Sequence, residues 1–235
     1  MPQRINEHGQ QIGPDVPAWT PRARPHQSPL TGQYAAVVRL DPAAHGDDLF
    51  AAFATDTSGA MWTYMPNGPF TERAVFDAFM TEAKVSTDPL FYAIINKATG
   101  RAEGFASYLR IDPAAGTIEV GFIAMSPLLQ KTRVASEAMY LMMAHAMDDL
   151  GYRRYEWKCD NLNAPSKRAA GRYGFTAEGV FRQATIYKGH NRDTAWFSIL
   201  DSEWPAIKAG FVAWLDPANF DADGVQRAAL ETRTM

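Results

Sequence analysis

The segment TIEVGFIAM (Thr117–Met125), the connector SPLLQKT (126–132) and the segment RVASEAMYLMMAHAMDDL (Arg133–Leu150) form the most informative pattern in the chain. The first segment is short, apolar and β-branched, which is typical of a buried strand, and the proline after Ser126 ends it. In the last segment apolar residues recur at helical spacing and predict one long helix with Gly151 at its C-terminal cap. Those residues are Ala135, Met139, Met142, Ala146 and Leu150. The pattern predicts a strand–turn–helix unit.

The turn between this strand and this helix has the features of a phosphate site. The first backbone N–H groups of a helix lack partners within the helix, and the helix dipole attracts anions to them. Lys131 and Arg133 lie within or beside the turn, and the small side chains of Val134, Ala135 and Ser136 would let a pyrophosphate approach the backbone. An ordinary strand–loop–helix unit with solvated basic residues explains the pattern alone equally well.

Four segments in a fixed order narrow this choice. They are QKTRVA (Gln130–Ala135), YEWKC (Tyr155–Cys159), NAPS (Asn163–Ser166) and GF (Gly174-Phe175). Together they resemble the GNAT N-acetyltransferase superfamily, in the branch of bacterial ribosomal-protein N-terminal acetyltransferases (RimJ/RimL-like). The resemblance covers roughly residues 34 to 200 and departs at Arg133, where most members have glycine.

The resemblance implies an α/β (α+β) fold of the GNAT acyl-CoA N-acyltransferase type. Its sheet is mixed, mostly antiparallel and twisted, splayed between the fourth and fifth strands, with helices on both faces. It also implies an enzyme that moves an acetyl group from acetyl-CoA to a primary amine by direct transfer in a ternary complex. The acceptor would be a protein N-terminus or a small, amino-acid-like amine.

The donor site that the resemblance implies lies around the turn. The backbone N–H groups of Arg133, Val134, Ala135 and Ser136 would hold the pyrophosphate. The pantetheine arm would pair with the end of the central strand, where a free N–H polarises the thioester carbonyl. The full set of expected coenzyme contacts is Ala124, Met125, Ser126, Gln130, Lys131, Thr132, Arg133, Val134, Ala135, Ser136, Asn161, Asn163 and Ser166. Asn161 is the weaker of the two asparagines, since it could simply cap a turn.

Two residues are candidates for the chemistry. Glu119 shares a strand face with Thr117 and Gly121, and it lies six residues before Met125, as the base does in GNAT histone acetyltransferases. A solvated or hydrogen-bonded strand glutamate is the alternative, with Glu178 and Glu103 as weaker bases. Ser166 matches the branch serine that reaches the coenzyme sulfur, although it also suits a helix N-cap.

One position differs from the RimJ/RimL-like branch, and this difference leaves the identities of the base and of the substrate open. The branch has a glutamate in its final hairpin where this chain has Thr185, which cannot act as that base. This departure supports an alternative function, a non-catalytic acyl-CoA-binding sensor or subunit. The tyrosine that many members use as the acid is Ala170 here.

The acceptor wall is expected between the first two strands of the domain. In the resembling family a helix–loop–helix there forms one wall of the acceptor site, which here would contain Trp62, Tyr64, Met65 and Phe79, with Glu119 facing it. Aromatic residues at helical spacing are also typical of simple core packing.

The composition fits an ordinary globular protein. The 235 residues carry a net charge of −3 and are 46% hydrophobic and 21% charged, which gives no reason to expect nucleic acid as a partner. No apolar run approaches the ~20 residues of a membrane span, and the N-terminus lacks a signal peptide's apolar core. The single cysteine, Cys159, fits a reducing cytoplasm and is expected as a small hydrophobe. The five histidines show no metal-ligand spacing, so no metal is expected, and His145 is assigned to helix surface or core.

Three regions are expected along the chain. Residues 1–30 form a proline-rich arm that Trp19 could anchor, or equally a disordered tail. Residues 31–201 form the acetyltransferase domain, with a parallel crossover only between the strand at Thr117 and the strand at Arg153. Residues 202–235 form a helix and tail, and Trp204, Phe211 and Trp214 on that helix suggest a homodimer contact.

Overall fold

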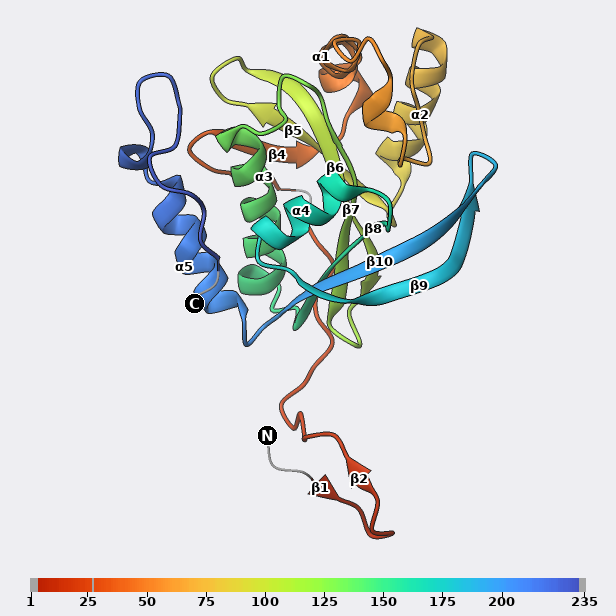
Figure 1. Cartoon of the computed structure of the whole chain (residues 1–235), viewed down its shortest axis with the longest axis vertical. Coiled ribbons are helices and arrows are strands. Elements are labelled where there is room, and N and C mark those ends of the chain that lie inside the picture. The colour runs from red at the N-terminus through yellow and green to blue at the C-terminus, as the bar shows by residue number, and fades with distance from the viewer. Residues whose placement is uncertain (1–3, 27, 233–235) are drawn as a thin grey trace.

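The computed structural model describes residues 4–26 and 28–232, so the part of the predicted arm at residues 1–3 and 27 lies outside the described residues. Its main body is built on one eight-stranded sheet with the strand order β3-β4-β5-β6-β7-β8-β10-β9 (Figure 1). The strands are β3 (Leu30–Thr31), β4 (Ala35–Arg39), β5 (Leu90–Asn96), β6 (Arg101–Asp112), β7 (Thr117–Met125), β8 (Arg154–Asp160), β9 (Thr176–Tyr187) and β10 (His190–Leu200).

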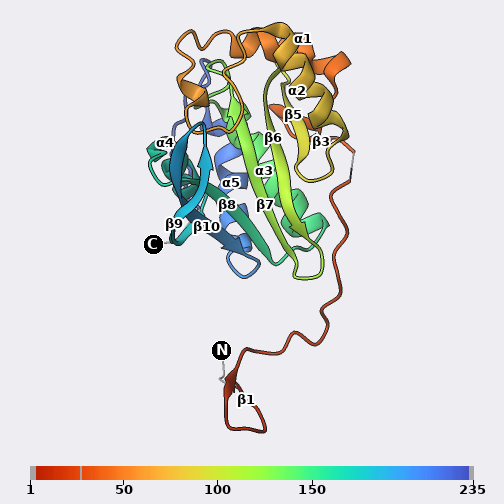
Figure 2. The same ribbon diagram turned by 90° about the vertical axis from the view of Figure 1, so that its right-hand side faces the viewer.

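Helices cover both faces of this sheet, as predicted. Helices α3 (Arg133–Ala144) and α5 (Trp204–Leu215) lie on one face, and α1 (Pro42–Phe53) and α2 (Arg73–Val85) lie on the other (Figures 1 and 2). Alternation along β5 explains why two cores form, because successive side chains point to opposite faces. Tyr92 and Ile94 join the core under α3, whereas Phe91 and Ala93 join the aromatic core under α1 and α2. The short helix α4 (Ala164–Arg172) follows β8.

The parallel pairing between β7 and β8 is short. It joins Thr117–Val120 to Arg154–Trp157, and the other neighbouring strands of the sheet pair antiparallel. Just beyond Val120, β7 carries a bulge at Phe122, which has φ 48°. There the ladder with β6 passes from Ser107↔Gly121 to Phe105↔Ala124, so two β7 residues oppose one β6 residue. A bulge bends its strand and increases its twist, and the predicted splay between these two strands is confirmed.

The predicted long helix is present from Arg133 to Asp149, but its type changes before its end. The α-helix stops at Ala144, and His145–Asp149 form a π-helical turn in which the Leu150 N–H donates to the His145 carbonyl over 3.0 Å. Gly151 then takes the left-handed conformation expected at the cap, with φ 69°. Single π turns occur often at functional positions.

The N-terminal arm contains a small hairpin and an anchoring side chain. β1 (Arg4–Ile5) and β2 (Gln11–Ile12) form a small hairpin that stands clear of the main body (Figure 1). Trp19 is an anchor, as predicted, because its indole N–H donates to the Ala114 carbonyl over 2.7 Å.

The homodimer stays a prediction, but the three aromatic side chains expected at its contact are not at the surface. Trp204, Phe211 and Trp214 are buried in the core of their own chain beside α3, so these side chains offer no surface for a second copy.

Two smaller observations concern the start of one helix and the apolar length of the helices. Helix α2 begins after Glu72, which makes no side-chain capping bond. None of the described helices combines the length and the apolar character needed to cross a bilayer.

Candidate functional site

The open end of β7 supplies one unpaired backbone amide. The predicted coenzyme contacts there were Ala124, Met125 and Ser126, but the Ser126 N–H is already used, since it donates to the Glu103 carbonyl on β6 over 3.2 Å. Strand N–H groups alternate in direction, so the Met125 N–H points to the other edge, where β8 has diverged. The Met125 carbonyl accepts from the Gln130 side chain over 2.8 Å. Of the three residues, Met125 therefore faces the gap.

The start of α3 lies next to this gap and keeps two free amides. Thr132 is the N-cap, and its hydroxyl accepts from the Ala135 N–H over 3.1 Å, while the Ser136 N–H donates to the Thr132 carbonyl. Within residues 4–26 and 28–232 no acceptor is found for the N–H groups of Arg133 and Val134. Lys131 adopts φ 62° before the helix, which turns the chain sharply. Of the four backbone amides that were expected to bind an anion, two, those of Arg133 and Val134, are therefore free to do so.

The Arg133 side chain turns away from the gap. Its guanidinium lies over the rings of Tyr34 (4.3 Å) and Phe220 (5.1 Å). Since a cation is attracted to the face of an aromatic ring, this contact fastens α3 to the C-terminal tail. The departure from glycine therefore leaves the approach to the backbone amides open.

The residues expected beyond β8 come together around α4. Asn163 is the N-cap of α4 and accepts from the Ser166 N–H over 3.1 Å, so the alternative role of Ser166 as the cap was wrong. The Ser166 hydroxyl accepts from the Trp157 indole N–H over 2.9 Å, and Ser166 also forms a side-chain hydrogen bond with the Cys159 thiol. Asn161 receives Lys167 at its side-chain and backbone oxygens. Burial raises the pKa of the neighbouring Cys159 thiol, consistent with the expected small hydrophobe.

Glu119 lies in a buried charge network on the sheet face opposite α3. Its carboxylate accepts from Lys158 Nζ at 2.8 Å and contacts Arg110 Nε at 3.2 Å. Lys158 also contacts Glu156 at 2.7 Å, and Arg154 joins Glu156 to Glu178. The network therefore holds three carboxylates and three cations, so their formal charges balance.

Burial dominates the acid–base behaviour of Glu119. Its side chain is 6% exposed, and the cost of desolvating a charged carboxylate raises its pKa despite the attraction of Lys158 and Arg110. A glutamate with a raised pKa is a better proton acceptor than an ordinary one. The two weaker candidates for the base have other partners. Glu103 accepts hydrogen bonds from Asn96 and Thr99. Glu178 forms an ion pair with Arg154, which holds the pKa of Glu178 at about 2.

A cleft of about 410 Å³ lies between the α1–α2 loop and the tip of the β9–β10 hairpin. Of the four residues expected at the acceptor wall, Trp62 and Tyr64 line this cleft, whereas Met65 packs on the aromatic core and Phe79 packs there against Phe91 and Phe105. Lys188 closes the cleft on one side, because its Nζ donates to the Trp62 carbonyl over 2.8 Å. The α1–α2 loop therefore contributes both a wall and core packing.

Asp160 is a cleft residue that the sequence did not single out. It ends β8 and is buried, and its carboxylate accepts from the Tyr187 hydroxyl over 2.9 Å and from the Leu162 N–H over 2.8 Å. Burial and this hydrogen bond raise the pKa of Tyr187 to about 12. Its position at the end of β8 could have indicated it, since a residue that ends a strand beside the splay lies at the mouth of the gap. Thr185, at the branch glutamate position, is exposed on β9.

Comparison with known proteins agrees with this geometry. The acetyltransferase (GNAT) domain family matches residues 38–176, well over half of the chain. The chain belongs to the GNAT acetyltransferase family. It is therefore an acyltransferase whose family uses acetyl-CoA. The ribosomal-protein branch stays a prediction.

Three proteins illustrate how similar this chain is to known acetyltransferases. The structure superposes on a GCN5-related N-acetyltransferase from Brucella melitensis with TM-score 0.90 and 47% identity, covering 92% of this chain and 97% of that one. A probable GNAT-family acetyltransferase from Chromobacterium violaceum gives TM-score 0.77 and 38% identity, covering 83% of this chain and 97% of that one. The curated N-acetyltransferase p20 of Bacillus licheniformis, itself uncharacterized, is 29% identical over 113 residues, which are 48% of this chain and 63% of p20. The match to p20 thus spans less than two thirds of that protein's length.

Proposed function

We propose that this GNAT protein acetylates a primary amine by direct transfer from acetyl-CoA, in the gap between β7 and β8. The observation that carries the proposal is the coincidence of two unpaired features. The parallel ladder stops at Val120, and the free N–H groups of Arg133 and Val134 open beside the unpaired half of β7. Free amides at a helix start bind phosphates, and an exposed strand edge can pair with an amide-containing arm.

The donor would lie along this path in one orientation. The Arg133 and Val134 amides, with Lys131, would hold the pyrophosphate, and the pantetheine would run along the open edge of β7. The Met125 N–H is then the donor that polarises the thioester carbonyl, as in an oxyanion hole. Asn163 would lie near the pantetheine amides, because it starts the helix on the far side of the gap.

Glu119 is our candidate for the base. In the transfer, the amine nitrogen bonds to the thioester carbon, the carbon–sulfur bond breaks, and the ammonium proton leaves to the base. The raised pKa of Glu119 suits it to accept that proton. Protonation of Glu119 removes one negative charge beside Lys158 and Arg110. The carboxylates of Glu156 and Glu178 in the same network can still balance part of their positive charge.

Ser166 is our candidate for stabilising the leaving thiolate. Its oxygen already accepts a hydrogen bond from Trp157, and its hydroxyl would donate to the coenzyme sulfur in place of its hydrogen bond with the Cys159 thiol. A donated hydrogen bond lowers the charge density on the thiolate without requiring full proton transfer.

The acceptor would enter through the cleft between the α1–α2 loop and the β9–β10 tip. Its volume of about 410 Å³ lies at the small end of small-molecule sites, which favours a small amine or a single terminal residue. Asp160 places a carboxylate in its lining, which attracts an ammonium group.

The experiment is acetyl-CoA turnover with a panel of amino acids, aminoacyl compounds and short peptides. We expect turnover on at least one class, a large loss in Glu119→Gln and a smaller loss in Ser166→Ala. Asp160→Asn should raise KM for the amine more than it lowers kcat. Glu178→Gln is the matched control, because it removes a network carboxylate away from the gap. Full activity in Glu119→Gln and Ser166→Ala would reject these roles.

A non-catalytic acyl-CoA sensor is the second candidate. Thr185 favours it, because the branch glutamate is absent, and so does the engagement of Glu119 by two cations. Calorimetry that finds tight acetyl-CoA binding, together with no turnover on any amine of the panel, would select it over the enzyme.

A further inference from the structure

The end of α3 that lies away from the gap carries a buried histidine with one nitrogen unsatisfied. The His145 side chain is 1% exposed, and its Nδ1 lies 2.9 Å from Asp149 Oδ2. Its Nε2 is buried and has no hydrogen-bond partner in the part of the chain that the structure describes. Leaving a buried polar atom without a partner is unfavourable, so this nitrogen points to a missing ligand.

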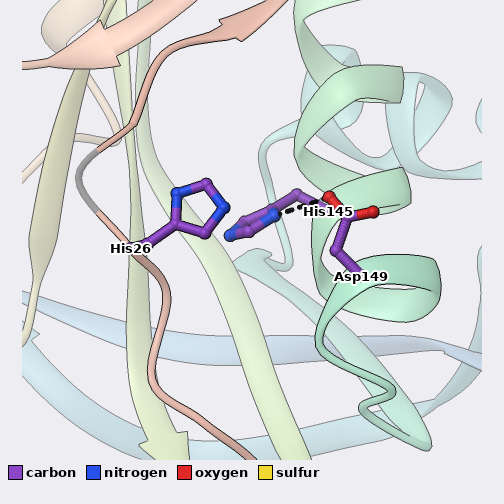
Figure 3. A group of neighbouring side chains, drawn as sticks. All are labelled: His26, His145 and Asp149. Carbon is purple, nitrogen blue, oxygen red and sulfur yellow. Dashed lines mark hydrogen bonds and ion pairs between the residues drawn. The ribbon is translucent and has the colours of Figure 1, made fainter.

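A second imidazole faces this histidine from the N-terminal arm. The rings of His26 and His145 lie 4.1 Å apart between centroids, and candidate ligand atoms of His26, His145 and Asp149 lie within 4.8 Å of one another. Figure 3 shows the His145 ring between the other two side chains, with one nitrogen directed at Asp149 and the other on the side of His26. Asp149 therefore holds one side of the ring while the other side faces the arm.

The backbone that carries His26 and the ring of His145 are both held in place before any ligand binds. The Tyr92 hydroxyl donates to the His26 carbonyl over 2.9 Å, and the Tyr152 hydroxyl donates to the Ala23 carbonyl over 3.1 Å, so the arm is fixed around His26. On the other side, the π turn sets His145 and Asp149 about one turn apart and brings their side chains together. Such prior ordering lowers the entropic cost of binding a ligand.

We propose that His26 and His145 bind a zinc-class divalent cation between them, with Asp149 as the carboxylate that positions the His145 ring. Metal-binding histidines usually donate their other ring N–H to a carboxylate or carbonyl, which orients the ring. Imidazole donors suit zinc, copper and nickel better than magnesium or calcium. The ion would join the arm to α3, and solvent would complete its coordination.

The state and mobility of the two rings fit this role. Asp149 lies 2.9 Å from Nδ1 of His145, which leaves the buried Nε2 of the same ring to face an ion. Zinc–nitrogen bonds of about 2.0–2.1 Å require a closer approach of the rings' ligand atoms to a common point. His26 can make that adjustment because it is exposed, whereas His145 is held by the core. Sequence spacing could not reveal the pair, since the two residues are distant in the chain.

The test is zinc titration calorimetry on the full chain without a histidine tag. We expect binding to the wild type, no binding to His26→Ala, and binding roughly 10- to 100-fold weaker in Asp149→Asn. His8→Ala is the matched control, because His8 lies in the same arm and is 71% exposed, and its affinity should equal the wild type. His26 is an exposed arm residue, so the His26→Ala result stands even if a His145→Gln variant fails to fold.

A second readout follows the arm itself. Zinc should slow trypsin cleavage after Arg22 in the wild type, a chelator should restore it, and His26→Ala should show neither effect. Equal zinc binding by wild type and His26→Ala would overturn the proposal, as would no binding by either. An arm that becomes easier to cleave at acidic pH but does not respond to zinc would also overturn the proposal. The contact between the two rings would then depend on protons and not on a metal.

Discussion

The two halves of β7 differ although they belong to one strand. Thr117–Val120 pairs on both edges and contributes Ile118 and Val120 to the core under α3. The half from Gly121 to Met125 pairs only with β6, carries the bulge at Phe122 and turns the Met125 amide to an unpaired edge. The closed half holds the sheet together, whereas the open half keeps backbone groups for a ligand. Stability and binding are thus separated within nine residues.

Glu119→Gln should have the largest effect, because it removes the proposed base from the border between the halves. We expect kcat to fall by about 10²-fold or more with little change in KM for acetyl-CoA, measured by steady-state kinetics. Since burial raises the pKa of Glu119, the acid limb of the pH profile of kcat/KM should lie above the usual range of a glutamate. That limb should disappear in the variant. An unchanged profile would assign Glu119 a purely structural role.

Ile118→Ala tests the closed half. Ile118 is fully buried, so its truncation should lower the free energy of unfolding by about 2–5 kcal/mol, measured in urea. Ile123→Ala, in the open half, should cost clearly less, because Ile123 is only half-buried. Equal losses at the two positions would contradict the separation of stability from binding.

Thr132→Ala tests the helix start that completes the open half. Loss of the N-cap should lower the free energy of unfolding by ~1 kcal/mol and raise KM for acetyl-CoA, because the first turn of α3 would fray. Asp41→Ala is a matched control, since Asp41 caps α1 through the Ala43 N–H at 2.9 Å. It should show a similar stability loss with unchanged KM. A raised KM in both variants would remove the link between this cap and the coenzyme.

The smallest effect is expected at Glu178, at the far end of the charge network. Its ion pair with Arg154 lowers its folded-state pKa to about 2, from about 4.5 in an unfolded chain. The stabilisation should therefore be complete above pH ~4.5 and should disappear as the pH falls towards 2. Because Glu178 is 38% exposed, we expect about 1 kcal/mol or less. The difference in unfolding free energy between wild type and Glu178→Gln should shrink on acidification, and a constant difference would contradict the pair.

The strand–turn–helix unit proposed to hold the donor was largely predictable from the sequence. The apolar run to Met125, the small residues after Lys131 and the crossover to β8 are local patterns, and backbone amides at a helix start follow from helix geometry itself. The details that failed depend on distant partners. The Ser126 amide was taken by Glu103, and Arg133 found the rings of Tyr34 and Phe220.

The acceptor side was accessible only in part. Aromatic residues of the α1–α2 region were expected at the cleft, but their spacing does not distinguish a wall such as Tyr64 from a core residue such as Phe79. Asp160 carried no motif, and its role depends on Tyr187 folding back from the hairpin.

The sequence by itself determined the strand–turn–helix unit, the family and the place of the splay, because periodicity, turn residues and motif order act over short distances along the chain. Only the tertiary structure decided the charge balance around Glu119, the carboxylate in the cleft and the meeting of His26 with His145. Those features arise between segments far apart in sequence, where burial and long-range contacts, and not local preference, set the environment of each side chain.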